Sequence, residues 1–328
     1  MDSKPFFIPI ASGKGGVGKS ILAANLAVAL ANTGHSVVAI DLDLGGSNLY
    51  SYLGLENIYS GIGDYFISKK GKLIDYLVQT NIPNLKYLAA DHRTTFMANI
   101  TYAQKAKLIN EIKNIQADYI VIDLGAGTTF NTLDYFDFSN NGLVVTTFEK
   151  PAILNTLSFI KNFIHRVALK EIKQNHTINA DINKAYKNIT GDDYLTINDI
   201  IDIVYKVDTA LASKIVTIIR SYQPRIIFNR GEHPDQLEVI NHMQPSIEKY
   251  LSVDLCFFGF LFEEDSTKLS SNNGSILLMR YPESILSKGI IEISKRIVKF
   301  NNKKISNSRD LLINDTREKF ELWNSNQE

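Results

Sequence analysis

The sequence Gly13-Lys14-Gly15-Gly16-Val17-Gly18-Lys19-Ser20 lies near the start of the 328-residue chain and fits the phosphate-binding pattern G-x-x-x-x-G-K-[ST]. Glycines in such a loop let the backbone curve closely around phosphate groups and turn its N–H groups toward them. Lys19 is placed to pair with the β- and γ-phosphates of a nucleotide, and the hydroxyl of Ser20 is placed to ligate Mg²⁺. The motif therefore predicts a nucleotide site that uses Mg²⁺.

The residues on either side of this loop have the expected patterns. An apolar run at 6–10 is typical of a buried strand and leads into the loop. An Ala- and Leu-rich helical pattern at 20–31 leads out of it and is stopped by Gly34. Bound phosphates would then lie at a helix N-terminus and gain from its dipole. A chance glycine-rich turn is the alternative, and the strand, the helix and the complete pattern together disfavour it.

Strand-like and helical patterns alternate along the rest of the chain. Short apolar runs that indicate strands occupy 36–40, 85–90, 119–123, 142–147, 224–230 and 257–262. Helical spacing of apolar residues covers 98–115, 152–167, 237–251 and 283–300, and shorter helices are expected within 58–80. This alternation predicts an α/β fold, a doubly wound and mostly parallel sheet flanked by helices.

Acidic residues follow two of the expected strands. Asp41 and Asp43 end the strand at 36–40, and Asp123 ends the strand at 119–123. Open α/β sheets bind ligands at the carboxyl ends of their strands, so these carboxylates are candidates for the phosphate and metal end of the site. The alternative is that they cap loops, because aspartate turns are common at strand ends.

The composition disfavours several classes of protein. Lysine and arginine number 35 and aspartate and glutamate number 35, which gives no support for a general nucleic-acid binder, although a local basic patch is compatible with it. The single cysteine, Cys256, rules out an intramolecular disulfide and a cluster held by several cysteines of one chain. No signal peptide and no apolar stretch near the ~20 residues of a membrane span are visible, so we expect a soluble, cytoplasmic protein.

Two segments depart from the alternation of strands and helices. Residues 168–222 are polar and rich in Asn and Lys, then helical over 195–207 and 210–219. We expect them to form a helical insertion in a nucleotide-binding domain that spans 1–300. The polar tail, 301–328, mixes its apolar residues with Asp and Glu, whereas an interfacial membrane helix pairs an apolar face with a Lys- and Arg-rich one. We therefore expect a helical tail that packs on the protein or on a partner.

A second lysine, Lys14, directly follows the first glycine of the loop, where an ordinary phosphate loop does not require one. A solvated surface lysine is the alternative. The sequence 14–20 resembles the deviant Walker A motif of the MinD/ParA family of P-loop ATPases, and the resemblance covers 8–165 and 224–300. It implies a P-loop NTPase fold of the SIMIBI type, ATP and Mg²⁺ as ligands, and a homodimer in the ATP state. In that dimer Lys14 reaches the nucleotide of the partner subunit.

The same resemblance implies roles for residues outside the loop. Asp43 would orient and activate the attacking water, and Asp41 and Asp123 would support Mg²⁺ through water. Residues 124–127 would form the second switch, whose glycines let backbone N–H groups approach the γ-phosphate. Asn229 would recognise adenine, with a turn asparagine as the alternative. The expected nucleotide-binding residues are Gly13, Lys14, Gly15, Gly16, Val17, Gly18, Lys19, Ser20, Ile21 and Asn229; the catalytic residues are Lys14, Lys19 and Asp43; and the metal-site residues are Ser20, Asp41, Asp43 and Asp123.

Within this family, residues 123–128 and 131–134 look closest to FlhG-like members, which regulate flagellar number and placement through a partner GTPase. Those regulators carry an N-terminal segment that activates the partner, whereas the first expected strand here already begins at residue 6. The resemblance therefore carries over more directly for the ATPase site than for the partner-activating function.

Four functions compete on these observations. An ATP-hydrolysing, dimerising switch that controls the positioning or number of a cellular structure, with a protein partner such as a GTPase or positioning factor, fits best. The alternative is a ParA-like DNA-partitioning ATPase, which predicts a clustered basic surface and salt-sensitive binding to nonspecific DNA. A membrane tether is compatible with the sequence but is not supported by its composition. An iron–sulfur relative would need ligands beyond Cys256, and intact Lys14, Lys19, Asp43 and Asp123 disfavour an inactive scaffold.

Overall fold

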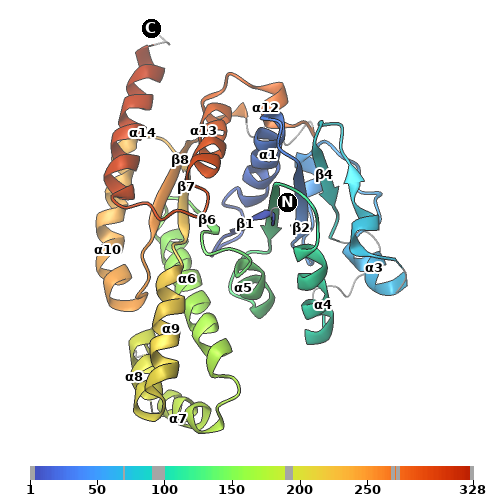
Figure 1. The fold of residues 1–328 in the computed structure, drawn as a ribbon. Coiled ribbons are helices and arrows are strands. Elements are labelled where there is room, and N and C mark those ends of the chain that lie inside the picture. Colours follow the sequence, from blue (N-terminus) through green and yellow to red (C-terminus); the bar gives the residue numbers. More distant parts are fainter. Residues whose placement is uncertain are drawn as a thin grey trace.

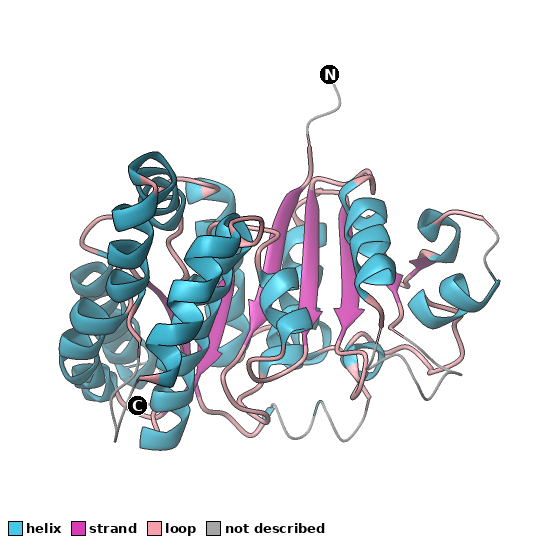
Figure 2. Ribbon diagram, turned by 90° about the horizontal axis from the view of Figure 1, so that it is seen from below, coloured by secondary structure: helices cyan, strands magenta, loops and turns pink. Residues whose placement is uncertain are grey.

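The computed structural model describes residues 4–68, 71–90, 100–188, 195–266, 270 and 274–325. Within them, eight strands form one sheet in the order β3-β4-β2-β5-β1-β6-β7-β8. Neighbouring strands are parallel except for β3, which is antiparallel to β4. Figures 1 and 2 show the strands side by side with helices packed around them. The predicted fold class, a doubly wound and mostly parallel α/β sheet, is confirmed.

The elements follow one another in the expected alternation. The strands are β1 Phe6–Ala11, β2 Val37–Leu42, β3 Val78–Gln79, β4 Leu85–Leu88, β5 Tyr119–Leu124, β6 Leu143–Thr146, β7 Arg225–Gly231 and β8 Cys256–Phe262. The helices include α1 Lys19–Asn32, α2 Leu49–Tyr52, α3 Ile62–Ser68, α4 Tyr102–Lys113, α5 Phe130–Phe136, α6 Lys150–Ile172, α10 Val239–Tyr250, α12 Leu277–Arg280 and α13 Ile285–Phe300, with the 3-10 helices η1 Leu73–Tyr76 and η3 Pro234–Glu238.

Both faces of the sheet are buried. In β2, Val38 and Ile40 belong to an apolar cluster with residues of α4, α5 and α6, whereas Val37 and Ala39 belong to a second cluster with residues of α1 and α13. Every residue of β2 is buried. This explains why the strand is apolar from Val37 to Ile40 and does not alternate with polar residues there.

The first half of the sheet contains the main differences from the sequence-based expectations. The strand expected at 85–90 ends at Leu88, and β3 lies in a stretch that was expected to be helical. A two-residue strand has no periodicity that a sequence pattern could reveal. Its turn is held by the side chain of Gln79, which donates to the backbone oxygen of Leu85 at 3.0 Å. His92, which the sequence predicts to be a surface residue, lies outside the described residues, as do 98 and 99.

Helices occupy the segment between α6 and β7. Helix α6 runs to Ile172, beyond the expected end at residue 167, and is followed by α7 His176–Lys187, α8 Ile197–Val207 and α9 Thr209–Ser221. These three helices and the end of α6 project away from the sheet (Figure 1). Thr196 caps α8 and Asp208 caps α9, because each side chain accepts a backbone N–H of the first turn. The described part of this segment is therefore formed by well-capped helices.

The tail forms one long helix, α14, over Ser308–Ser325. It lies against β8, the edge strand of the sheet, and buries Leu312 and Thr316 (Figure 1). Arg296 of α13 donates a 2.8 Å hydrogen bond to Asp315, which ties α14 to the neighbouring helix. Covering an edge strand with a helix protects its unpaired backbone groups. The tail packs on its own chain, which is one of the two arrangements that the sequence favours.

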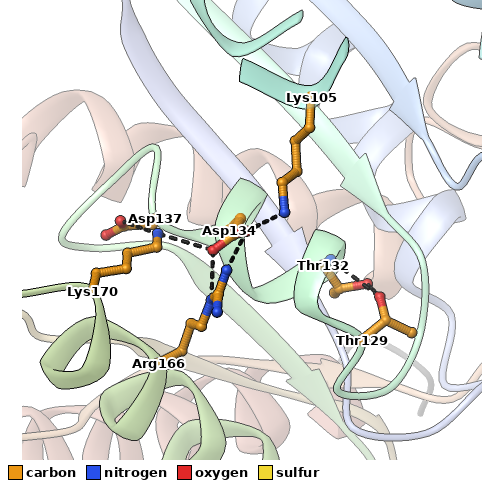
Figure 3. Close-up of polar contacts among 7 residues, drawn as sticks. All are labelled: Lys105, Thr129, Thr132, Asp134, Asp137, Arg166 and Lys170. Atoms are coloured by element: carbon orange, nitrogen blue, oxygen red, sulfur yellow. Dashed lines mark hydrogen bonds and ion pairs between the residues drawn. The ribbon is translucent and has the colours of Figure 1, made fainter. Parts of the chain in front are cut away.

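A cluster of charged side chains joins α5 to α4 and α6 (Figure 3). Asp134 of α5 accepts a hydrogen bond from Lys105. It also accepts two hydrogen bonds from Arg166, each of 2.9 Å, and one of its carboxylate oxygens lies 3.0 Å from Nζ of Lys170. Burial alone would raise the pKa of Asp134, but these three cations outweigh burial and hold the pKa well below its usual value. Lys170 also donates to Asp137 at 2.8 Å. The cluster therefore fixes α5, the helix that follows residues 124–127.

We predict that Asp134→Asn lowers the free energy of unfolding at neutral pH by about 3–5 kcal/mol, because it leaves the buried Lys105 without its counter-charge and weakens the pairing of Arg166. Since the folded pKa of Asp134 lies below its unfolded value, the stabilisation is fully present above the unfolded pKa and is lost as pH falls through the folded pKa. Urea unfolding as a function of pH measures both effects.

The matched control is Glu283→Gln, which removes an exposed ion pair with Lys288 at 3.0 Å. Such surface pairs contribute about 0–1 kcal/mol, so the control should unfold much like the wild type. Equal stability of the Asp134→Asn protein and this control would contradict the role assigned to the cluster.

Candidate nucleotide-binding site

The phosphate loop, residues 13–18, connects β1 to α1 at the middle of the sheet. Gly16 and Gly18 have φ angles of 82° and 90°, in the left-handed region that favours glycine. A Cβ atom on Gly18 would lie 2.3 Å from Nδ2 of Asn229, and one on Gly13 would lie 2.2 Å from the backbone oxygen of Asn155 in α6. The loop therefore needs glycine at these positions for close approach to β7 and α6.

Lys19, at the start of α1, reaches across to β5. Its Nζ lies 2.5 Å from Oδ1 of Asp123, and the side chains are 8% and 0% exposed. Burial raises the pKa of Asp123, and the charge of Lys19 opposes that rise. The second carboxylate oxygen of Asp123 is buried and has no partner at normal hydrogen-bond geometry in the described structure, although the hydroxyl of Ser20 lies close enough to lower the pKa of this carboxyl group. A buried unsatisfied oxygen of this kind fits a site that takes a hydrated cation.

Asp41 lies near the end of β2, in register with Asp123 of β5, and Asp43 directly follows the strand. Asp41 is fully buried and accepts hydrogen bonds from Ser47 Oγ at 2.7 Å and from the backbone N–H groups of Asp43 and Leu49. Burial and the nearby charge of Asp123 raise the pKa of Asp41 to about 7. These bonds are typical of an aspartate that caps a loop, which is the alternative role that the sequence allowed for Asp41. This role is compatible with an additional role at a metal site.

Residues 124–127, the expected second switch, meet Asp43 and the phosphate loop at this edge of the sheet. A Cβ atom on Gly125 would lie 3.3 Å from Oδ1 of Asp43, so residues 124–127 pass directly beside that carboxylate. The N–H of Gly127 donates to the backbone oxygen of Ser12 at 2.9 Å, which joins this segment to the phosphate loop. Any movement of the phosphate loop or of Asp43 therefore acts on the segment that leads into α5.

Asn229 lies at the carboxyl end of β7 and is 7% exposed. Its Nδ2 donates to the backbone oxygen of Val17 at 2.8 Å. This bond uses one N–H of the amide group and leaves its oxygen and its second N–H for a ligand. Asn229 thus belongs to the wall of the site, next to the phosphate loop, where the sequence places it.

A cavity of about 630 Å³ extends from the phosphate loop to the end of β8, within the range typical of small-molecule sites. Its lining consists of Ser12, Gly15, Gly16, Gly18, Lys19, Ser20, Ile21, Leu22, Asp43, Asn48, Tyr52, Ala126, Asn229, Arg230, Leu261, Phe262, Glu263, Glu264, Leu286 and Ile290. Eight expected site residues are among them: Gly15, Gly16, Gly18, Lys19, Ser20, Ile21, Asp43 and Asn229.

Other expected residues lie beside this cavity. Gly13 and Val17 support the loop from behind, and Asp41 and Asp123 lie buried beneath it. Lys14 is exposed and does not belong to the lining. A hydrogen bond from Thr147 lowers the pKa of Glu149 and the charge of Lys14 lowers it further, so Lys14 lies near Glu149 at the start of α6.

The sequence analysis missed the far wall of the cavity. Leu261 and Phe262 end β8, and the position of polar Glu263 and Glu264 directly after the last strand was the signal that could have identified them. Leu286 and Ile290 come from α13, whose apolar positions look like those of any amphipathic helix. Arg230, with a φ of 59°, adjoins Asn229 and carried no pattern of its own.

A glycine-rich loop between a central parallel strand and a helix, with a lysine that reaches a strand-end aspartate, defines a P-loop nucleotide-binding protein. A family model described as "ParA: NUBPL iron-transfer P-loop NTPase" matches residues 5–171. The chain belongs to the ParA/MinD family of P-loop NTPases, as the resemblance of its phosphate loop predicts.

Curated relatives carry the names MinD and YlxH. The septum site-determining protein MinD of Synechocystis is 31% identical over 69% of this chain and 80% of that protein. The flagellum site-determining protein YlxH of Helicobacter pylori is 31% identical over 47% of this chain and 52% of that protein, which agrees with the FlhG-like resemblance. The chain spans 58%, 59% and 53% of the length of three further MinD proteins that it matches.

Solved structures show the same fold. MinD of Pyrococcus horikoshii, complexed with Mg-ADP, matches with a TM-score of 0.59 and 19% identity over 92% of this chain and all of that chain. The MinC:MinD complex of Aquifex aeolicus matches with a TM-score of 0.58 and 22% identity over 92% of this chain and 97% of that chain. At these identities the likeness concerns the fold alone.

Iron transfer, the activity in the description of the family model, has no matching site among the described residues. Cys256 is buried inside β8, and burial raises the pKa of its thiol to about 11. The described residues contain no group of three or more His, Cys, Asp or Glu that could hold a metal ion. We therefore do not extend iron transfer to this chain. In the same described residues, no helix is both long and apolar enough to cross a bilayer.

The packing of Gly18 gives a direct test of the loop geometry. Gly18→Ala forces an L-residue into the left-handed region, at about 1–2 kcal/mol, and drives its Cβ into the Asn229 amide. We expect a clear fall in the melting temperature. Gly15→Ala is the matched control, because a Cβ there meets nothing within 4 Å and its φ is ordinary. Equal melting temperatures for the two variants would contradict this geometry.

Proposed function

We propose that this protein is an ATP-dependent, dimerising switch that hydrolyses ATP and controls the positioning or number of a cellular structure. The observation that carries the proposal is the contrast between the two lysines of one loop. Lys19 is buried and paired with Asp123, whereas Lys14 is exposed and does not line the cavity that its own loop forms. A lysine in this position is free to enter the site of a second subunit.

The substrate is proposed to be ATP. The cavity continues from the phosphate loop to an apolar wall of Ile21, Leu261 and Leu286, which suits a flat base. The amide of Asn229, held by its bond to Val17, offers a ligand both an acceptor and a donor. This combination suits the edge of adenine, which carries an exocyclic amino donor beside ring-nitrogen acceptors.

Ser20 and, through water, Asp41 and Asp123 would hold Mg²⁺, which when bound neutralises charge on the β- and γ-phosphate oxygens. The fit rests on the buried oxygen of Asp123 that lacks a described partner at normal hydrogen-bond geometry and on the raised pKa of Asp41, since a nearby cation would favour both ionised carboxylates. The ammonium group of Lys19, which pairs with Asp123, would then also pair with the phosphates.

In the proposed reaction, Asp43 positions a water molecule in line with the γ-phosphorus. The oxygen of this water molecule forms a bond to the γ-phosphorus as the bond between that phosphorus and the β–γ bridging oxygen breaks. The products are therefore ADP and inorganic phosphate. Lys14 of the partner subunit stabilises the negative charge that develops on the transferred group. Because this lysine acts from the second chain, hydrolysis depends on dimerisation, and a slow rate in the monomer follows.

Loss of the γ-phosphate would release residues 124–127, which contact both the phosphate loop and Asp43. We assign residues 1–300 to the ATPase domain, 168–222 to a helical insertion and 301–328 to a helical tail. The projecting insertion is a suitable surface for a protein partner such as a GTPase or positioning factor (Figure 1). The names MinD and YlxH of its relatives support a positioning role in the cytoplasm.

A ParA-like DNA-partitioning ATPase is the second candidate, favoured by the family model that matches residues 5–171, whose description begins with ParA. Nonspecific DNA binding that weakens steeply with salt and requires ATP would favour this function. The balanced charge of 35 basic and 35 acidic residues favours the protein-partner reading.

A mixing experiment tests whether Lys14 acts in trans. We expect Lys14→Ala and Asp43→Ala each to lose ATP hydrolysis while still binding Mg-ADP. Mixing equal amounts of the two should restore phosphate release, because a mixed dimer has one site with Asp43 of one chain and Lys14 of the other. Phosphate release is measured in single and mixed samples.

The matched control mixes Lys14→Ala with a chain that carries both substitutions, a combination that offers no complete site and should stay inactive. Normal hydrolysis by Lys14→Ala alone would show that the lysine is not needed. Two inactive single variants that remain inactive when mixed would contradict the trans arrangement.

A further inference from the structure

The C-terminal helix α14 ends at the base side of the candidate nucleotide cavity. Phe262, the last residue of β8, lines this cavity and is 7% exposed. On its other side it stacks on Phe320 of α14, with ring centroids 5.7 Å apart and planes 16° apart. The ring of Trp323, one helical turn further along α14, lies 6.3 Å from Phe262. Two tail residues therefore pack directly on a residue of the cavity wall.

The path of α14 along β8 produces this contact. The N–H of Phe257, near the start of β8, donates to Ser308 at the start of α14 at 3.1 Å. From there both elements run in the same direction. Helix α14 advances about 18 Å from Ser308 to Phe320 at 1.5 Å per residue, and β8 advances about 17 Å from Phe257 to Phe262 at 3.3 Å per residue. The tail thus reaches the carboxyl edge of the sheet together with β8.

Phe320 also contacts the element that follows β7. Its ring lies 4.8 Å from the ring of His233, edge to face, and Arg317 lies 3.6 Å from Asp235 in η3. Strands β7 and β8 supply the base end of the cavity, through Asn229 and Arg230 and through Leu261 and Phe262. One side chain of the tail therefore packs against the ends of both strands that form this wall.

The aromatic contacts continue into the core. Phe262 packs on Phe260 at 4.7 Å, and Phe260 packs on Phe148, which lies between β6 and α6 and stacks on Phe228 of β7 at 5.2 Å. Phe228 is the residue before Asn229. The rings from Phe228 to Trp323 form a continuous row, so Phe320 and Trp323 are the outer end of a packed support for the base-binding strands.

We propose that α14 is a positioning element of the nucleotide site, in which Phe320 and Trp323 hold Phe262 and the end of β8 in place against the base of the nucleotide. This rests on the proposed binding of an adenine nucleotide. Its specific consequence is that the tail strengthens binding of the base and leaves binding of the phosphates to the loop at 13–20 unchanged. A partner that displaces α14 would thereby lower the affinity for nucleotide.

The test compares two ligands on the full chain. Mg-ADP occupies both ends of the site, and Mg-pyrophosphate reaches only the phosphate loop. We expect Phe320→Ala to weaken Mg-ADP binding roughly 10-fold, the size of a lost aromatic pair, with pyrophosphate affinity unchanged. Calorimetry measures both affinities. Phe320→Tyr, which keeps the ring, should restore ADP affinity, and Leu311→Ala, at an exposed position of the same helix, should bind like the wild type.

Trp323 provides a second readout, because it is the only tryptophan of the chain. Its fluorescence should change on addition of Mg-ADP to the wild type and not on addition of pyrophosphate. Because ADP is used, this measurement does not depend on dimerisation.

Each failure has its own meaning. If Phe320→Ala binds ADP as the wild type does, or loses ADP and pyrophosphate affinity equally, the positioning role is wrong and the proposed function stands. The positioning role is also wrong if ADP binds to the wild type without changing Trp323 fluorescence and Phe320→Ala leaves the affinity for ADP unchanged. If the wild type binds neither ADP nor ATP, the proposed function itself is wrong and this inference falls with it.

Discussion

The buried ion pair between Lys19 and Asp123 is the interaction on which the rest of the site depends. It joins the phosphate loop to β5, a neighbour of the central strand β1, and leaves one oxygen of Asp123 without a described partner at normal hydrogen-bond geometry. Two buried charges in the middle of a sheet are stable only with close pairing, and they favour a ligand that brings its own charges. A nucleotide with its cation has this property, because the phosphates offer Lys19 a second anion and the cation offers Asp123 a second partner.

Two sets of contacts lead outward from that pair. One passes through Asp43 and residues 124–127 to α5, which the Asp134 cluster anchors on α4 and α6 (Figure 3). Because α6 continues into the projecting helices α7 to α9, this path connects the phosphate end of the site with the surface that we assign to a partner. The other passes from Asn229 and Phe262 to α14, so the base end is connected with the tail.

The sequence patterns were sufficient to predict the sheet and the position of Lys19 and Asp123 at one edge of it. Asp123 lies at the carboxyl end of β5, and Lys19 begins α1, directly after the loop that follows the neighbouring parallel strand β1. Parallel strands bring such ends together, although the two residues are far apart in the chain. The motif at 13–20 has a glycine at position 18, and the structure shows that a larger residue there would collide with the side chain of Asn229. Asp41 shows the limit of this reasoning, because its three hydrogen bonds to Ser47, Asp43 and Leu49 follow from a loop conformation that no local pattern specifies.

The other end of the site could not be predicted for a related reason. Phe262 is an apolar residue at the end of an apolar strand, and nothing in the sequence marks it as part of a site. Phe320 lies in a tail with many charged residues, so its apolar residues form no clear helical pattern. Their contact depends on the parallel path of α14 and β8, which is a property of tertiary packing. Similarly, Asp134 was noticeable in the sequence only by resemblance, whereas its cations come from two other helices.

Light scattering of the Asp43→Ala protein, in Mg-ATP and in Mg-ADP, measures whether nucleotide controls dimerisation. Without the carboxylate that positions water, bound ATP should persist. We expect the molar mass to double in ATP and to remain that of a monomer in ADP. A monomer in saturating Mg-ATP would contradict a nucleotide-gated dimer and would leave Lys14 to serve a partner of another kind.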